Sequence, residues 1–386
     1  MKRKVVSAML ILSMAAMAFS TAALADDVIT IGVFEPASGD NGAGGKQEVL
    51  GMQYANVVQP TVEVDGTEYK VELNIVDNES STDKAASAAA QAAEGASIVL
   101  GSYGSPVCIA AGDTFLNAGV AALGVTCTNP QVTDGNDNYF RICFLDPFQG
   151  TVLANFAASQ FEAKKAYVLT KLGDDYSAGL GHYFSEAFKN LGGEVIEETF
   201  PEGNADFTSY ITTAVNEGAD VIMAPTSTEA AQLIIETASA QGVTVPLLAG
   251  DTWDSNVILN AAKGKDVEIY VTTFYQEGAD EEFDASIKEW INSDSTALAN
   301  NGGDDTIAAV TVMGYDAYFM ALEAIKNAGS PDPGAVLAAL PDTTYTGVTG
   351  SIAFDEIGDA ARDTAFVKSA DTESGSWVFV TAQGVE

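Results

Sequence analysis

The chain has 386 residues, and its 54 acidic residues far outnumber its 17 basic ones, which gives a formal net charge of −37. Such a chain lacks the basic surface that nucleic acids require, and anionic membranes are equally poor partners. The single histidine (His182) and the three cysteines, none in a CxxC pair, argue against a metal centre and against a disulfide scaffold. We therefore expect no cofactor, no metal and no nucleic-acid partner.

The first 25 residues have the pattern of a secretory signal peptide. Residues 2–4 are basic, residues 5–19 are apolar, and residues 23–25 (Ala-Leu-Ala) fit the small-x-small cleavage rule. The apolar run is short for a membrane span. We expect cleavage near Ala25 and a periplasmic or extracellular mature protein, which is long enough for two domains.

Short apolar segments then alternate with longer helical ones. In chain order, strands are expected at 28–34, 69–76, 97–100, 120–125, 139–144, 166–170, 194–200, 219–223, 245–249, 268–273, 350–354 and 377–381. Helices are expected at 46–57, 82–93, after 105, at 147–160, 175–190 and 206–216, after 229, and at 280–293, 305–327 and 333–340. This alternation predicts doubly wound parallel sheets with helices on both faces, in two α/β domains.

The segment 97–130 reads as strand, turn, helix, strand and turn. Ser105 and Pro106 open its helix as N-cap and first-turn residues, and its second strand ends in Thr126 and Thr128. Ligands of open α/β sheets bind at the carboxyl ends of the strands, and a helix N-terminus there favours an anion such as a carboxylate. Ser105 alone could simply cap its helix, and Thr128 alone could simply shape a turn. Their placement on one sheet edge favours a ligand site.

Several segments match one family in order and spacing. They are 124–130, 163–169 with 175–180, 206–208 with 218–221, and 347–350 with 354–359. These segments resemble branched-chain amino-acid-type (Leu/Ile/Val-binding-protein-like) periplasmic binding proteins, the solute receptors of ABC importers. The resemblance covers essentially all of the mature chain.

The resemblance implies an α/β fold of two doubly wound parallel-sheet lobes joined by a three-strand hinge, the type I periplasmic binding fold. Lobe one would comprise residues 26–146 and 275–365, and lobe two residues 147–274 and 366–386. Such lobes close around a ligand by hinge motion. A monomeric receptor that delivers its ligand to ABC permease subunits is the expected function.

The resemblance also implies a site for an amino acid. Ser105, Thr126 (through its backbone) and Thr128 would hold the α-carboxylate from lobe one, and Thr128 would also contact the ammonium. Tyr176 would close over the ligand from lobe two, and Asp251 would take the ammonium. Tyr103 and Thr226 complete the candidate set. The chemistry agrees, because a zwitterion needs hydroxyl and N–H donors at one end and a carboxylate at the other.

Two positions depart from the family pattern. The loop before the first helix often carries an aromatic residue in this family, whereas this chain has Gly44 and Gly45. The lobe-two loop often offers an aromatic residue where this chain has Thr226. Both departures leave an amino acid as the expected ligand, with a side chain that is larger or more polar than a branched aliphatic one.

Two other classes of protein are alternatives to a transport receptor. One is a ligand sensor that recognises a small carboxylate or amide and passes its closed form to a signalling partner. Another is an enzyme, but no Ser-His-Asp or Cys-His arrangement can be built around His182, so we expect none. Asp251 and Tyr176 also have non-functional interpretations. Asp251 could be a solvated loop acid or a helix cap, and Tyr176 could be a surface or core aromatic.

Overall fold

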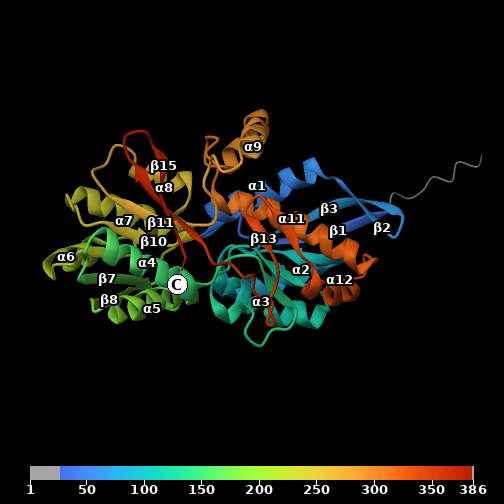
Figure 1. Cartoon of the computed structure of the whole chain (residues 1–386), viewed down its shortest axis with the longest axis horizontal. Coiled ribbons are helices and arrows are strands. Elements are labelled where there is room, and N and C mark those ends of the chain that lie inside the picture. The colour runs from blue at the N-terminus through green and yellow to red at the C-terminus, as the bar shows by residue number, and fades with distance from the viewer. Residues whose placement is uncertain (1–26, 385–386) are drawn as a thin grey trace, which may run out of the picture.

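The structure is a computed structural model that describes residues 27–384. The predicted signal peptide lies outside the described residues. Two β-sheets, each covered by helices, form two lobes that lie side by side (Figure 1). The predicted α/β fold with two doubly wound lobes is confirmed.

The first sheet has the strand order β2-β3-β1-β4-β5-β6, and all neighbouring strands are parallel except β2 and β3. Its strands are β1 (Val28–Glu35), β2 (Thr61–Val64), β3 (Thr67–Asp77), β4 (Ala96–Leu100), β5 (Ala122–Gly124) and β6 (Tyr139–Arg141). Strand β4 is buried along its whole length, as a central parallel strand should be.

Helices cover both faces of this sheet. Helices α1 (Gly42–Val58) and α11 (Ala309–Ala328) pack on the face that carries Ile31. Helices α2 (Thr82–Ala93) and α3 (Ser105–Ala118) pack on the opposite face, which carries Phe34. Because successive side chains of a strand point to opposite faces, β1 contributes to both cores.

The second sheet has the order β15-β14-β11-β10-β9-β7-β8, and its two C-terminal strands run antiparallel to their neighbours. Its strands are β7 (Lys165–Lys171), β8 (Glu194–Phe200), β9 (Val221–Met223), β10 (Leu247–Ala249), β11 (Ile269–Thr273), β14 (Ala365–Asp371) and β15 (Ser376–Gln383). Helices α4 (Asp146–Gln160) and α5 (Asp175–Asn190) pack on one face. The other face carries α6 (Thr208–Asn216), α7 (Thr228–Ala240) and α8 (Asn256–Ala262).

The strand order shows that the chain passes between the sheets three times: after β6, after β11 and before β14. The remaining elements are α9 (Glu281–Ser293), α10 (Ser295–Asn300), α12 (Pro333–Ala339), β12 (Tyr345–Gly347), β13 (Gly350–Ile352) and the 3-10 turns Pro130–Val132, Asp251–Trp253 and Leu340–Asp342. The exact bounds given above for the two lobes stay a prediction. No helix within residues 27–384 is long and apolar enough to cross a membrane.

Two details of the expected elements were wrong. Ser105 is the first residue of α3 and does not cap it, because Gly104 holds the N-cap position and no side chain bonds there. The first helix begins at Gly42, four residues earlier than expected, so Gly44 and Gly45 lie inside α1. Both corrections matter for the site. No side chain caps the N-terminus of α3, and Gly44 of α1 lies beside Tyr103, which comes just before the N-cap of that helix.

Candidate functional site

The four lobe-one candidates lie at the predicted sheet edge. Tyr103 and Ser105 follow β4, and Thr126 and Thr128 follow β5. All four residues are buried. The Ser105 hydroxyl accepts a hydrogen bond from the backbone N–H of Asn129 at 3.1 Å, so it ties the start of α3 to the loop after β5.

The three lobe-two candidates also come together. Tyr176 lies in the first turn of α5, Thr226 follows β9, and Asp251 begins the 3-10 turn after β10. The Tyr176 hydroxyl lies 3.3 Å from Asp251 Oδ1 and 3.1 Å from Thr252 Oγ1. The Thr252 hydroxyl in turn donates to the Thr226 carbonyl at 2.9 Å.

The two groups face one another across a small pocket. Its lining residues come from both lobes: Asn41, Tyr103, Gly104, Ser105, Pro106, Thr126, Asp174, Tyr176, Ser227 and Thr252. The cavity is small, with a volume of about 10 Å³, so the two lobes lie close together at this point. Tyr103 spans it, because its hydroxyl donates to the Thr252 carbonyl at 3.0 Å. Thr128, Thr226 and Asp251 lie behind this lining.

Asp251 has one carboxylate oxygen that is engaged and one that is not. Oδ1 accepts from Gln149 Nε2 at 2.9 Å and from the Tyr176 hydroxyl at 3.3 Å. Oδ2 is buried and has no hydrogen-bond partner. Burial raises the pKa of Asp251 to about 6. An uncompensated buried carboxylate is costly, so this oxygen is a suitable partner for a cationic ligand group.

Two buried glutamates beside the pocket were missed by the sequence reasoning. Glu35, at the end of β1, accepts from the backbone N–H of Tyr103 at 2.7 Å. Glu48, in α1, accepts from the Thr126 hydroxyl at 2.5 Å. Burial and the neighbouring Glu48 raise the pKa of Glu35 well above its usual value, and burial raises the pKa of Glu48 to about 7. For Glu35 the sequence did contain a signal, because this acid comes at the end of an apolar strand, where ligands of α/β sheets bind.

Thr128 lies next to a further buried acid, Asp146, which begins α4. The backbone N–H of Asp146 donates to the Thr128 carbonyl at 3.0 Å. Burial raises the pKa of Asp146 to about 8, although the adjacent Thr128 hydroxyl lowers it. Thr128 therefore contacts the segment where the chain first crosses between the lobes.

The buried cations near the site are already paired with other acids. Arg141 forms an ion pair with Asp359, and Lys368 forms one with Asp254 at 3.0 Å. The carboxyls of Glu35, Glu48, Asp146 and Asp251 form no ion pair with a described residue, although the charge of Arg141 lowers the pKa of Asp146. The three cysteines are buried free thiols, and residues 27–384 contain no cluster of His, Cys, Asp or Glu that could hold a metal ion.

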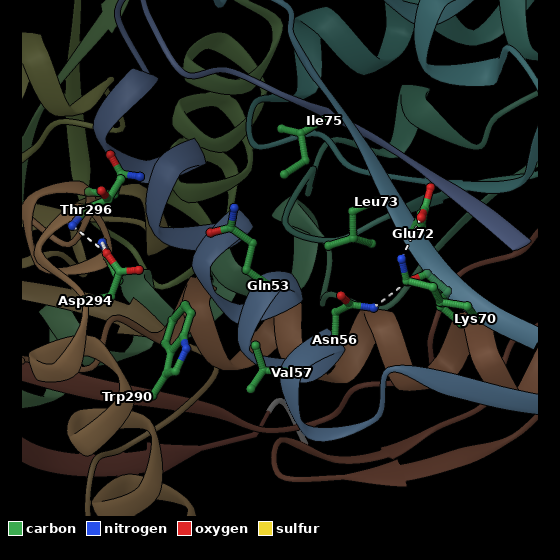
Figure 2. A pocket seen from close by; sticks show the side chains of 13 residues that line it. Gln53, Asn56, Val57, Lys70, Glu72, Leu73, Ile75, Trp290, Asp294 and Thr296 are labelled. Atoms are coloured by element: carbon green, nitrogen blue, oxygen red, sulfur yellow. Dashed lines mark hydrogen bonds and ion pairs between the residues drawn. The ribbon is translucent and has the colours of Figure 1, made fainter. Parts of the chain in front are cut away.

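A larger, more open pocket lies on the first lobe alone, between α1, β3 and the α9–α10 region (Figure 2). Gln53, Leu73 and Trp290 are among its lining residues. None of the candidate residues lines it, and no part of the second lobe faces it. A ligand there would not bridge the lobes, so the smaller interlobe pocket is the better candidate.

The fold and the pocket between its lobes are those of a two-lobed solute-binding protein. A family profile described as "Periplasmic binding protein" matches residues 28–374. The chain belongs to this family. Members of the family are solute-binding proteins, so the expectation that the chain is not an enzyme is confirmed.

Named relatives are similar over most of the chain. The "Leu/Ile/Val-binding protein homolog 1" of Brucella melitensis is 31% identical and the match covers 89% of this chain and 90% of the relative. An "Amino acid binding protein" of Pseudomonas aeruginosa is 26% identical over the same shares of each chain, 89% and 90%.

Solved structures of binding proteins are also similar to this chain. The leucine binding protein LivK of Thermotoga maritima matches with a TM-score of 0.80 and 31% identity, covering 92% of this chain and 99% of that one. The substrate binding protein LivJ of Streptococcus pneumoniae, in complex with isoleucine, matches with a TM-score of 0.79 and 25% identity, covering 93% and 99%. A benzoate complex from R. palustris, at 18% identity, a TM-score of 0.78 and 92% and 96% coverage, supports the fold alone. These matches confirm the type I periplasmic binding fold.

Proposed function

We propose that this protein binds a free amino acid in the interlobe pocket and delivers it to the permease of an ABC importer. The observation that carries this proposal is the pairing of opposite chemistries across the pocket. Hydroxyl and N–H donors lie at the start of α3 on one side. The Asp251 carboxylate, with its unpaired Oδ2, lies behind the other side.

The α-carboxylate of the ligand would bind at the lobe-one side. Helix α3 is 14 residues long, and the N–H groups of its first turn have no partner within the helix. Their partial positive charge favours an anion. Ser105 and the backbone of Thr126 would add donors at the same place, with Thr128 orienting the loop from behind.

The ammonium group would bind at the lobe-two side. Asp251 Oδ2 would accept from it, while Oδ1 stays bonded to Gln149 and Tyr176. Such a charge-assisted bond is stronger than a neutral one. Only the closed arrangement completes both ends of the zwitterion, so ligand binding would favour closure.

Delivery to a permease follows from the relatives rather than from the pocket. The similar LivJ structure of Streptococcus pneumoniae is that of a substrate binding protein of a branched-chain amino acid transporter. We infer the same role here, for a monomeric protein exported by its signal peptide. Closure of the lobes, with the bounds given above, would present the loaded form to the membrane partner.

A thermal-shift screen of the mature protein tests this proposal. The panel holds the twenty amino acids, small carboxylates, amides and sugars. A ligand at a hundredfold excess over its Kd stabilises the native state by about 2.7 kcal/mol, which is readily measured. We expect shifts from amino acids, and we expect Asp251→Ala to lose them while remaining folded. Shifts only from compounds without an ammonium group would contradict the role of Asp251.

A further inference from the structure

The aromatic residue that the family pattern places near residue 44 is absent from this chain, and the space beside Gly44 of α1 is filled by a residue from another part of the chain. A Cβ atom at Gly44 would lie 2.4 Å from Cζ of Tyr103 and 2.7 Å from both of its Cε atoms. The Tyr103 ring therefore fills the space directly above Gly44. Only a glycine at this position of α1 permits such an approach.

Tyr103 is held firmly in this position. Its backbone N–H donates to Glu35 at 2.7 Å, and its hydroxyl donates to the Thr252 carbonyl at 3.0 Å. Its side chain is almost completely buried. The ring forms a fixed wall of the pocket that leaves less room for a ligand side chain than an open glycine pair would leave.

Most of the other residues that line the pocket have polar side chains. Besides the two tyrosines, the lining consists of Asn41, Ser105, Thr126, Asp174, Ser227 and Thr252, with Gly104 and Pro106 as the exceptions. An aliphatic side chain placed against these groups would separate them from water without offering hydrogen bonds, which is costly.

One polar atom of the lining has no partner in the protein. Oδ1 of Asn41 is buried and accepts no hydrogen bond, and the Asn41 side chain does not cap α1. Asp174 and Ser227, in contrast, are occupied as the N-caps of α5 and α7. The Asn41 amide is thus available to a ligand.

We propose that the ligand is an amino acid with a short, polar, hydrogen-bonding side chain, and that Tyr103 and Asn41 select it over branched aliphatic amino acids. This inference rests on the proposed function, because it assumes that an amino acid occupies the interlobe pocket. A site built to hydrogen-bond a polar ligand rejects an isosteric apolar one strongly, because its own polar groups are left unpaired.

The most direct test compares L-threonine with L-valine by isothermal titration calorimetry. The two differ only by a hydroxyl in place of a methyl group. We expect threonine to bind at least tenfold more tightly than valine, and also more tightly than leucine. Equal or tighter binding of valine or leucine would overturn the inference while leaving the proposed function intact. Binding of no amino acid would overturn the proposed function itself.

Substitution of Asn41 tests its role in selecting the ligand. Asn41→Ala should weaken threonine binding several-fold and leave valine binding unchanged, so the ratio of the two falls. A control is Asn56→Ala, which removes a half-buried amide near the other end of α1, outside the pocket. It should leave the ratio as in the wild type. A wild-type ratio in Asn41→Ala would contradict the role given to Asn41.

Tyr103→Ala should remove the wall and let leucine bind more tightly than it binds the wild type. Tyr103→Phe keeps the ring and loses only the bond to Thr252, so it should still disfavour leucine. If leucine binds Tyr103→Phe and Tyr103→Ala equally, the ring is not the selecting element. Should Tyr103→Ala fail to fold, the Asn41→Ala ratio still decides the inference.

Discussion

At the scale of single residues, several carboxyl groups around the pocket are buried away from water and form no ion pair with a described residue. Glu48, Asp146 and Asp251 are buried, and burial raises their pKa values to about 7, 8 and 6. In the unfolded chain such groups titrate near 4. The ligand-free folded protein therefore binds protons more strongly than the unfolded chain does between about pH 4 and pH 8.

This difference predicts how stability depends on pH. Because the native state holds more protons in this range, the free energy of unfolding should fall as pH rises from 5 to 8. One pKa unit corresponds to about 1.4 kcal/mol, so we expect a loss of a few kcal/mol. Melting temperatures of the ligand-free protein from pH 5 to pH 8 measure it. Glu48→Gln, which keeps an acceptor for Thr126, should flatten the curve; a melting temperature that rises with pH would refute the explanation.

Asp251 predicts the opposite pH dependence for ligand affinity, which should rise as pH rises. An ammonium group pairs with the ionised form of Asp251, whose pKa of about 6 is set mainly by burial. Amino-acid affinity should therefore weaken as pH falls from 7.5 to 5. Calorimetric titrations at several pH values measure this. Asp251→Asn should bind weakly at every pH, and a wild type whose affinity is unchanged at pH 5 would argue against the pairing.

At the scale of elements, helix α3 is the part of the fold that makes an anion site. Gly104 as N-cap leaves the first N–H groups of α3 uncovered by any side chain, which is why the absence of a Ser105 cap is informative. The Ser105 hydroxyl is free of capping and instead anchors Asn129 in the loop after β5. Helix start and loop thus act as one unit.

Removing the Ser105 hydroxyl should weaken amino-acid binding. Ser105→Ala loses a bond to the ligand carboxylate and the bond to Asn129, and we expect a cost of about 1–3 kcal/mol in binding free energy. Titration calorimetry measures it. The control is Ser97→Ala, because Ser97 is equally buried in the same lobe but bonds to the Pro331 carbonyl, away from the pocket. Similar losses in both variants would show a general effect on the lobe.

The helices and strands were largely predictable from the sequence, but the side-chain contacts between distant elements were not. The apolar strand before Gly101 and the loop after β5 could be found because their signals are local. Glu35 bonds to Tyr103, 68 residues away, and Glu48 to Thr126, 78 residues away. No local pattern indicates such contacts. The ring of Tyr103 over Gly44 escaped prediction for the same reason, since α1 and the turn after β4 meet only in the folded lobe.

At the scale of the whole molecule, the two lobes also touch outside the pocket. Gln47 from α1 donates to Asn256 at 2.9 Å and accepts from Ser255 at 2.8 Å. On the other side, Lys171 forms an ion pair with Asp40 at 2.6 Å. These contacts join segments of both lobes and belong to a closed arrangement. They should make the closed form accessible before a ligand binds.

Gln47→Ala should shift the ligand-free protein towards the open form and lower its ligand affinity, because binding must then supply more of the closure free energy. Small-angle X-ray scattering should show a larger radius of gyration for the ligand-free variant than for the wild type. The control is Asn138→Ala, whose amide bonds to the Val120 carbonyl within one lobe. An unchanged radius of gyration in Gln47→Ala would mean that these contacts do not hold the lobes together.

The central claim is that a zwitterion bridges the lobes through Asp251. Titration of the mature protein with an amino acid and with the same compound lacking its ammonium group, such as L-valine and isovalerate or L-threonine and 3-hydroxybutyrate, tests it most directly. We predict that only the amino acid binds, and that Asp251→Asn removes this discrimination. Equal binding of the acid without the ammonium group would contradict the claim.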